Sequence, residues 1–297
     1  EDGLRIRVCH WLPQDTASAD LNGTVFIFPG RTEYIEKYGP AARELHQRGY
    51  AALAIDWRGQ GLADRMLADR RLGHIDVFSN FQHDVAAVMK LAKRLDLPQP
   101  WYLVGHSMGG AIGLRALHYG LQVAAAAFSA PMWGIGMPGP LRPIAWLLTG
   151  TSHLLGMVEA ITPGTKSETY VLYEPFEQNK LTHDREMYDH MRRQAQAHPA
   201  LMIGGPTMKW LNEALRETRR LARMPSPAVP CLTFLGSDEA IVDTARIRAR
   251  MAAWPNGRLQ MIEGGQHEVM MEGPAIRAQV FDACAAHFDA HLSAPAS

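Results

Sequence analysis

The sequence contains few cysteines, and none of them lies in a disulfide or zinc-binding pattern. Among its 297 residues, only Cys9, Cys231 and Cys284 are cysteines, and no Cys-x-x-Cys pair is present. Their odd number and wide spacing are typical of reduced thiols, so we expect a cytoplasmic protein. A His-Glu-x-x-His motif is also missing. We therefore expect neither a metal site nor another cofactor.

An excess of charge and a long apolar run are missing as well. The chain has 30 Lys and Arg residues and 30 Asp and Glu residues, which gives a formal net charge of zero. This balance argues against a general nucleic-acid binder, which needs a basic excess or a basic stripe. No apolar run reaches the ~18 residues of a membrane-spanning helix. The opening residues Glu1, Asp2 and Gly3 do not resemble a signal peptide, so we expect none.

Short apolar segments alternate with amphipathic helical patterns over much of the chain. The predicted strands are Leu4–Trp11, Thr24–Phe28, Ala51–Ile55, Trp101–Val104, Val123–Phe128, Cys231–Leu235 and Leu259–Ile262. The predicted helices are Tyr38–Arg48, Phe78–Leu95, Ala111–His118, Val242–Ala253 and Pro274–His291. Such alternation predicts βαβ units and therefore an α/β fold, with a mostly parallel central sheet flanked by helices.

The alternation is interrupted in the middle of the chain. From residue 132 to residue 228 no strand pattern is found, and charged amphipathic helices are predicted at Thr182–Gln196 and Lys209–Arg223. The same segment contains an apolar stretch at Leu147–Ile161. We therefore expect residues 1–131 and 229–297 to form the α/β core, and residues 132–228 to form a mainly helical insertion.

A serine stands between glycines where a predicted strand meets a predicted helix. The segment Gly105-His106-Ser107-Met108-Gly109 matches the pattern Gly-x-Ser-x-Gly. In this context the pattern is typical of a nucleophile elbow, a strained turn whose glycines remove side chains that would clash with the strand and the helix. Ser107 is therefore the predicted nucleophile. The alternative is a glycine-rich turn that happens to contain a serine.

A serine nucleophile needs a general base, and the base needs an acid that orients it. In a sheet of this kind the acid and then the histidine follow the serine along the chain. Of the 13 histidines, only His267 lies in a loop directly after the last predicted strand, so it is the predicted base. Three carboxylates follow the preceding strand and are candidates for the acid: Asp238, Glu239 and Asp243.

Several segments together resemble one known family. They are Pro29-Gly30-Arg31-Thr32-Glu33-Tyr34, Asp56-Trp57-Arg58-Gly59-Gln60-Gly61, Gly73-His74, the serine segment with Gly110, and Gly264-Gly265-Gln266-His267-Glu268. They resemble the α/β-hydrolase superfamily and, within it, the bacterial lysophospholipase and monoacylglycerol lipase group. The Gly-Arg-x-Glu and Arg-Gly-Gln-Gly pieces look most like the lysophospholipase L2 type. The resemblance implies an α/β-hydrolase fold in which the insertion is a cap.

The resemblance also implies which acid orients the histidine. In the superfamily this acid stands three residues after a glycine and is followed by one residue and two aliphatic residues. Counted from Gly236, that spacing selects Glu239 and leaves Asp238 as the alternative. The usual residue is Asp, so the longer Glu side chain has to fold back to reach His267.

Two backbone groups are implied to form the oxyanion hole. They are the N–H groups of Met108, which follows the nucleophile, and of Arg31, although Pro29-Gly30 stands where the family usually has His-Gly. The Arg31 side chain has two interpretations, an ion pair with Glu33 or another acid, or contact with an anionic head group. The loop from Asp56 to Gly61 lacks a phosphate-loop pattern, so we interpret it as a structural turn.

The resemblance implies a serine carboxylic ester hydrolase that cleaves single-acyl lipids, lysophospholipid or monoacylglycerol, through an acyl-enzyme. A short-chain esterase, a thioesterase, a peptidase or a transacylase on the same triad is the alternative, and a non-catalytic ligand receptor is a further one. The expected partner is the acyl lipid, with no nucleic acid and no obligate protein partner. The apolar stretch Leu147–Ile161 has three interpretations: cover of the acyl pocket, a core of the cap, or peripheral contact with a membrane or micelle.

Overall fold

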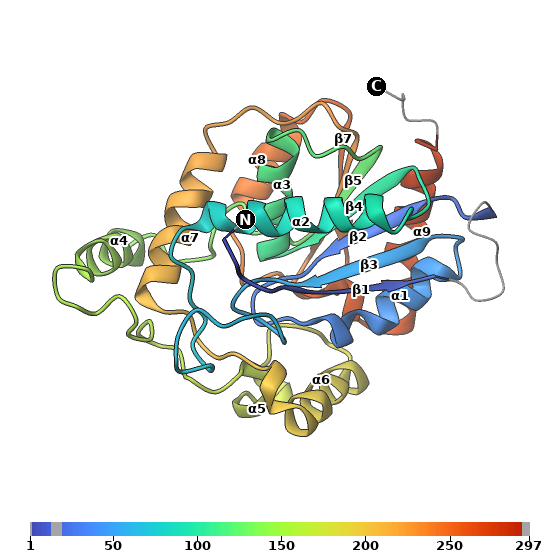
Figure 1. Ribbon diagram of the computed structural model, residues 1–297. Coiled ribbons are helices and arrows are strands. Elements are labelled where there is room, and N and C mark those ends of the chain that lie inside the picture. The colour runs from blue at the N-terminus through green and yellow to red at the C-terminus, as the bar shows by residue number, and fades with distance from the viewer. Residues whose placement is uncertain (1, 13–19, 293–297) are drawn as a thin grey trace.

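The computed structural model describes residues 2–12 and 20–292, and its centre is one twisted sheet (Figure 1). The sheet has seven strands in the order β1-β3-β2-β4-β5-β6-β7. All neighbouring strands are parallel except β1, which pairs antiparallel with β3 at one edge. The strands are β1 Arg7–Trp11, β2 Thr24–Phe28, β3 Ala51–Asp56, β4 Trp101–His106, β5 Ala125–Ser129, β6 Cys231–Gly236 and β7 Gly257–Ile262. The predicted α/β class with a mostly parallel sheet is confirmed.

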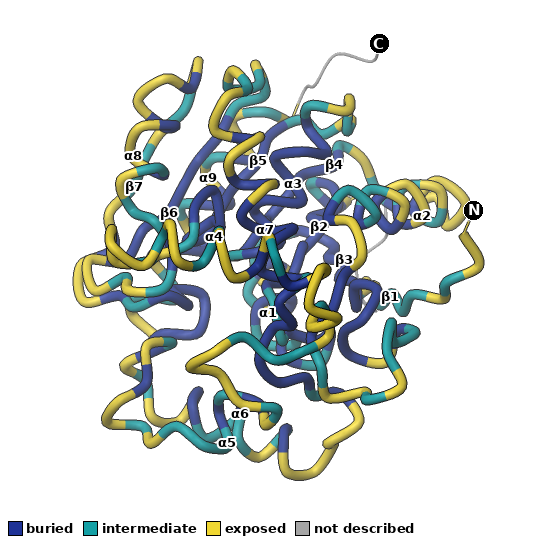
Figure 2. The backbone as a smooth tube through the Cα atoms, turned by 90° about the vertical axis from the view of Figure 1, so that its left-hand side faces the viewer, coloured by how far each residue is buried: buried dark blue, intermediate teal, exposed yellow. Residues whose placement is uncertain are grey.

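Helices cover both faces of the sheet. Helices α1 (Gly39–His46) and α9 (Pro274–Asp289) pack on one face, and α2 (Phe81–Arg94), α3 (Met108–His118) and α8 (Thr244–Ala252) pack on the other. Figure 2 shows the central strands as the buried middle of the molecule. Every residue of β2, β3, β4, β5 and β6 is buried. This burial explains why these strands are continuous apolar runs in the sequence.

Some predicted boundaries differ from the observed ones. The first strand begins at Arg7 rather than Leu4, and α3 begins at Met108, three residues before its predicted start at Ala111. The glycines at the start of α3 have weak helix propensity, but the turn at Ser107 directs the chain straight into the helix. Short 3-10 helices lie at η2 Ile35–Tyr38, η3 Phe78–Asn80, η4 Phe176–Gln178, η5 Pro199–Leu201 and η6 Val269–Met271. Of these, η3 falls within the predicted helix Phe78–Leu95, and the apolar periodicity did not reveal the other four.

The segment between β5 and β6 contains helices and no strand of the sheet within residues 132–228. The helices are α4 Leu141–Thr151, α5 Tyr170–Tyr173, α6 Arg185–Ala197 and α7 Met208–Leu221. Of the apolar stretch Leu147–Ile161, only the part up to Thr151 is helical. Helix α7 packs on α3, where Glu217 forms a buried ion pair with Arg115, and α4 packs on α7. Among the described residues, no helix is long and apolar enough to span a membrane.

Candidate active site

Ser107 occupies the turn between β4 and α3 in a strained conformation. Its φ of 48° and ψ of −116° are unfavourable for a residue with a side chain, and such strain concentrates at functional sites. The turn is held from both sides, because the Ser107 N–H donates to the Ser129 carbonyl (3.0 Å) and the Ser107 carbonyl accepts from the Met132 N–H (2.8 Å). A Cβ at Gly109 would lie 1.9 Å from the Phe28 carbonyl oxygen, so this glycine lets the loop after β2 approach the start of α3.

His267 and Glu239 meet at the carboxyl edge of the sheet. The Nδ1 of His267 lies 2.7 Å from Oε2 of Glu239. The other carboxylate oxygen accepts the N–H groups of Ile241 (2.5 Å) and Val242 (3.0 Å). Burial acts to raise the pKa of Glu239, but these hydrogen bonds and His267 hold it below its ordinary value. A charged Glu239 assigns the proton of His267 to Nδ1 and leaves Nε2 as the acceptor.

The other two candidate acids lie elsewhere. Asp238 is exposed, and its Oδ2 lies 3.0 Å from Nε2 of His183. Asp243 caps α8 by accepting from the Arg246 N–H (3.2 Å), and its second oxygen lies 2.5 Å from the Arg142 guanidinium. The structure therefore brings Glu239 to the histidine and keeps both aspartates away from it.

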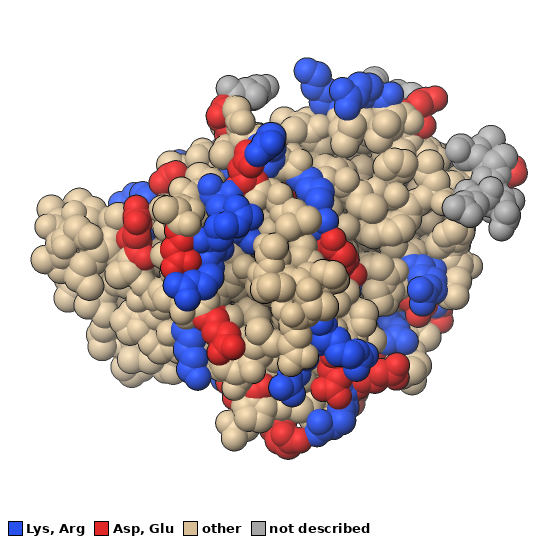
Figure 3. Space-filling view, turned by 60° about the horizontal axis from the view of Figure 1, so that its bottom comes forward, with Lys and Arg blue, Asp and Glu red and all other residues tan. Residues whose placement is uncertain are grey.

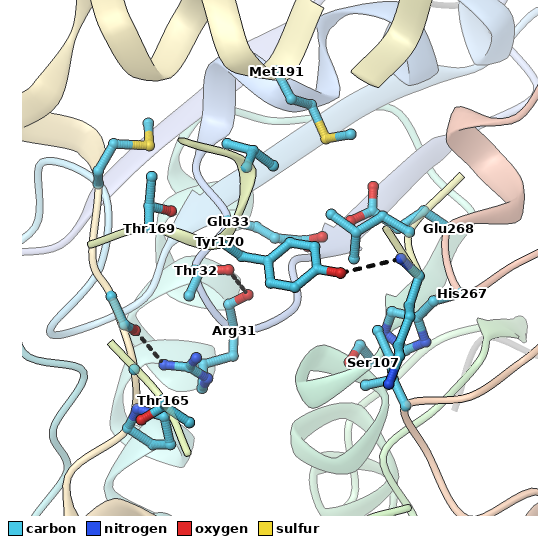
Figure 4. A pocket seen from close by; sticks show the side chains of 18 of the residues that line it. Arg31, Thr32, Glu33, Ser107, Thr165, Thr169, Tyr170, Met191, His267 and Glu268 are labelled. Carbon is cyan, nitrogen blue, oxygen red and sulfur yellow. Dashed lines mark hydrogen bonds between the residues drawn. The ribbon is translucent and has the colours of Figure 1, made fainter. Parts of the chain in front are cut away.

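Ser107 and His267 line one cavity of about 440 Å³ between the sheet edge and the inserted segment (Figure 4). The cavity is lined largely by apolar side chains, among them Met132, Val171, Leu181, Met191, Met202 and Leu211. No hydrogen bond of the Ser107 hydroxyl is recorded within residues 2–12 and 20–292. Contacts of this kind often tighten only when substrate binds. Ser107 and His267 therefore face the same largely apolar cavity.

The loop after β2 carries the predicted oxyanion donor and is braced by neighbouring side chains. Neither the Arg31 N–H nor the Met108 N–H donates to an acceptor in the described part of the chain. Trp57 donates its indole N–H to the Pro29 carbonyl (2.9 Å), and Gln60 donates to the Gly30 carbonyl (3.0 Å). The glycine-rich loop after β3 therefore holds this loop in place, as the interpretation of a structural turn predicts.

A buried group of charges, which no sequence pattern predicted, lies beneath the site. The Lys37 ammonium is 2.6 Å from Oε1 of Glu33 and 2.6 Å from Oε2 of Glu268. Burial lowers the pKa of Lys37, but the two carboxylates outweigh it and raise the pKa above its ordinary value. The one available signal was the spacing of Glu33 and Lys37, which are four residues apart and so share a face of a helical turn.

This charged group also contains an arrangement that could hold a metal ion. Ligand atoms of Glu33, His106 and Glu268 lie within 4.8 Å of one another. The Lys37 ammonium already lies between the two carboxylates and pairs with both. Burial lowers the pKa of His106 to about 4, so its ring is neutral and packs 4.8 Å from the His267 ring, measured between centroids. The group fits an ion-pair network that supports the His267 loop rather than a metal centre.

The Arg31 side chain does not pair with Glu33. Its Nη1 donates to the Gly204 carbonyl (2.8 Å), and its guanidinium lies over the Trp210 ring, 5.3 Å from the centroid. Glu33 instead accepts from Lys37 and from the Gly30 N–H. The predicted ion pair of Arg31 with Glu33 is therefore wrong, because Lys37 pairs with that carboxylate, and Arg31 pairs with no other acid within residues 2–12 and 20–292.

Comparisons with known proteins identify the family of this chain. The family model Hydrolase_4, described as "Serine aminopeptidase, S33", matches residues 19–274. Lysophospholipase L2 of Escherichia coli (strain K12) is 34% identical over 282 residues, which cover 91% of this chain and 81% of that protein. Probable lysophospholipase L2 of Haemophilus influenzae is 30% identical over 281 residues, covering 93% and 86%. These matches confirm the predicted resemblance.

Solved structures share the fold at low sequence identity. A soluble variant of monoglyceride lipase from Saccharomyces cerevisiae superposes with a TM-score of 0.75 and 17% identity, covering 99% of this chain and 94% of that one. Monoacylglycerol lipase from Paleococcus ferrophilus gives a TM-score of 0.69 and 17% identity, covering 97% and 99%. The predicted α/β-hydrolase fold is confirmed by these neighbours.

Proposed function

We propose that this chain, which belongs to the serine aminopeptidase S33 family (Hydrolase_4), is a serine carboxylic ester hydrolase of single-acyl lipids. The observation that carries the proposal is the 2.7 Å contact between His267 and Glu239 beside a cavity that Ser107 also lines. Relatives named lysophospholipase L2 and monoacylglycerol lipase support the same substrate class, a lipid with one acyl ester.

In the first half of the proposed reaction, Ser107 attacks the ester carbonyl carbon. His267 takes the hydroxyl proton at Nε2, and Glu239 stabilises the resulting imidazolium through Nδ1. The backbone N–H groups of Arg31 and Met108 donate to the oxyanion. The C–O bond to the alcohol then breaks, the leaving oxygen takes the proton from His267, and the acyl group stays on Ser107.

The second half releases the fatty acid. A water molecule gives a proton to His267 and attacks the acyl carbon, and the bond to the Ser107 oxygen breaks as the serine regains its proton. The apolar side chains of the cavity supply a dry environment for the acyl chain, which strengthens the electrostatic contacts at the reacting ester.

A common acyl-enzyme predicts a specific partition experiment. Palmitoyl esters of lysophosphatidylcholine, glycerol and p-nitrophenol are hydrolysed with hydroxylamine present, and palmitic acid and palmitoyl hydroxamate are measured. We expect one hydroxamate-to-acid ratio for all three, because the leaving group has departed before the partition. Ratios that differ between esters would contradict the acyl-enzyme.

A substrate panel separates the proposal from its alternatives. Palmitoyl lysophospholipid and monoacylglycerol are compared with palmitoyl-CoA, a short p-nitrophenyl ester and an aminoacyl anilide, each under the same conditions. We expect the highest kcat/KM on the long-chain oxygen esters. Preference for the thioester, the short ester or the anilide would instead indicate a thioesterase, a short-chain esterase or a peptidase.

We propose that residues 132–228 form a cap, and that its outer face contacts the lipid surface that holds the substrate. Large apolar side chains of α4 and the turn after it are exposed, namely Leu141, Ile144, Leu147, Leu148, Leu154, Leu155 and Met157. Figure 3 shows the lobe at the left, which α4 forms, with few charged side chains. On the neighbouring α7, Arg216, Arg219 and Arg220 are exposed, which favours an anionic lipid surface.

A further inference from the structure

The Arg31 guanidinium lies in the same cavity as the proposed nucleophile. Arg31 follows β2 directly in the loop that carries the oxyanion donor, and it lines the cavity together with Ser107 and His267. Figure 4 shows its side chain across the cavity from these two residues. The guanidinium in this position would contact the part of a bound substrate that extends beyond the reacting ester.

No carboxylate neutralises this guanidinium within the described ranges 2–12 and 20–292. Of the acids that line the cavity, Glu33 and Glu268 are held by Lys37, and Glu168 forms no ion pair with Arg31. Surrounding protein removes much of the hydration of Arg31 and lowers its pKa to about 10. A desolvated cation without a counter-charge is unfavourable on its own, so the site favours an anion.

One edge of the guanidinium is available for that anion. Nη1 donates to the Gly204 carbonyl (2.8 Å), and the Trp210 ring lies against the planar face, 5.3 Å from the guanidinium carbon to the ring centroid. Nε and Nη2 have no acceptor among the residues that the structure describes. These two groups form the edge of arginine that binds two oxygens of one phosphate or carboxylate.

The missing side chain of Gly73 makes room for this arrangement. A Cβ at position 73 would lie 2.8 Å from Nη1 of Arg31 and 3.4 Å from the Ile203 side chain. Gly73 also pairs with the inserted segment, because its N–H donates to the Gly205 carbonyl (3.3 Å). The core and the inserted segment therefore both fix the guanidinium inside the cavity.

We propose that the Arg31 side chain binds the phosphate of the substrate, so that the enzyme selects lysophospholipids over neutral monoacylglycerols. This inference rests on the proposed function. The spacing supports it, since about six bonds separate the Arg31 backbone nitrogen from the guanidinium carbon, and about six separate the ester carbonyl carbon of a 1-acyl lysophospholipid from its phosphorus. One residue can therefore donate to the oxyanion through its backbone and to the phosphate through its side chain.

The test compares two substrates that differ only in the head group. 1-Palmitoyl lysophosphatidylcholine and 1-palmitoylglycerol are presented in the same detergent micelles to the wild type and to Arg31→Met, which keeps the backbone N–H. The readout is the ratio of kcat/KM for the phospholipid to kcat/KM for the neutral lipid. We expect Arg31→Met to lower this ratio about 10- to 100-fold, the size of a lost charge-assisted contact, and Arg31→Lys to restore part of it.

Arg65→Met is the matched control for a purely structural role. Arg65 also donates to carbonyls of the inserted segment, Ala200 (3.0 Å) and Met202 (3.4 Å), and burial lowers its pKa to about 10 as well, but it does not line the cavity. We expect Arg65→Met to leave the substrate ratio unchanged. An unchanged ratio in Arg31→Met, or an equal loss on both substrates, would overturn the phosphate site.

A binding measurement keeps the inference separate from the proposed activity. Non-hydrolysable ether analogues, 1-O-hexadecyl glycerophosphocholine and 1-O-hexadecylglycerol, are titrated into the same variants. We expect Arg31→Met to weaken binding of the phosphate analogue at least 10-fold more than binding of the neutral one. If the wild type hydrolyses neither ester, while Arg31→Met still loses binding of the phosphate analogue selectively, the proposed function fails and the phosphate site stands. Equal effects on both analogues would reject the phosphate site.

Discussion

Glu239 contacts His267 from a buried position, while Asp238, its neighbour in the chain, points to solvent. The Glu239 side chain is 0% exposed and lies 2.7 Å from the imidazole, whereas the Asp238 side chain is 50% exposed and pairs with His183. The longer glutamate side chain folds back and satisfies its second oxygen with the N–H groups of Ile241 and Val242. The carboxylate is thus held in one orientation toward the base.

This arrangement predicts a large loss of kcat for one of two adjacent substitutions and almost none for the other. We expect Glu239→Ala to lower kcat about 10³- to 10⁴-fold, because the imidazole loses its tautomer and its counter-charge. Asp238→Ala is the matched control and is expected to stay within about threefold of the wild type, since surface positions of this kind contribute little. Steady-state hydrolysis of a palmitoyl ester gives kcat for both variants. A larger loss of kcat in Asp238→Ala would indicate that Asp238 is the acid that orients His267.

Lys37 is predicted to be a major contributor to stability. Lys37→Met leaves Glu33 and Glu268 as two buried carboxylates without a counter-ion, which is expected to cost about 3–5 kcal/mol in the free energy of unfolding. Urea unfolding measures the change. The exposed Lys90→Met serves as the control and is expected to change stability by less than about 0.5 kcal/mol. Equal stabilities for the two variants would contradict a large contribution of Lys37 to the free energy of unfolding.

The sequence was sufficient for the fold class and for most of the candidate site. Ser107 is flanked by glycines and stands between an apolar strand and a helix. These features predict a turn, and a turn can be inferred from neighbouring residues alone. The ion pair of Lys37 with Glu268 and the position of Asp238 depend on segments far apart in the chain, so no local pattern reveals them. Arg31 illustrates the same limit, because only the structure shows that Lys37 pairs with Glu33 and leaves Arg31 without an acid among the described residues.

Burial of His106 predicts a loss of stability in mild acid. Its ordinary pKa is 6.5 and burial lowers it to about 4, although Glu33 opposes this while His267 and Lys37 reinforce it. Between these values the unfolded chain binds a proton that the folded chain does not, so the free energy of unfolding falls as pH falls.

We expect the wild type to lose about 2 kcal/mol more than His106→Gln between pH 7 and pH 5. Urea unfolding of both proteins at the two pH values gives the comparison, and groups common to both, such as the buried His287, cancel in the difference. Identical pH dependence in the two proteins would contradict a neutral, buried His106.

The exposed apolar face of the insertion predicts contact with lipid surfaces. Leu147, Leu154 and Leu155 are 65%, 74% and 67% exposed. Replacing all three by Ser is expected to reduce cosedimentation with vesicles of phosphatidylcholine and phosphatidylglycerol, because each loses apolar area that the bilayer would bury. Leu62→Ser is the control, because Leu62 is also exposed but lies outside the inserted segment. Unchanged vesicle binding in the triple variant would place the lipid contact elsewhere.

Serine-dependent hydrolysis is tested by measuring fatty-acid release from 1-palmitoyl lysophosphatidylcholine and 1-palmitoylglycerol by the wild type and by Ser107→Ala. Circular dichroism and thermal unfolding establish that both proteins are folded. We expect the wild type to release fatty acid from at least one of these lipids, and Ser107→Ala to be at least about 10³-fold slower, because the nucleophile has been removed. Equal rates for the two proteins, or no release from either lipid by a folded wild type, would contradict serine-dependent hydrolysis of single-acyl lipids.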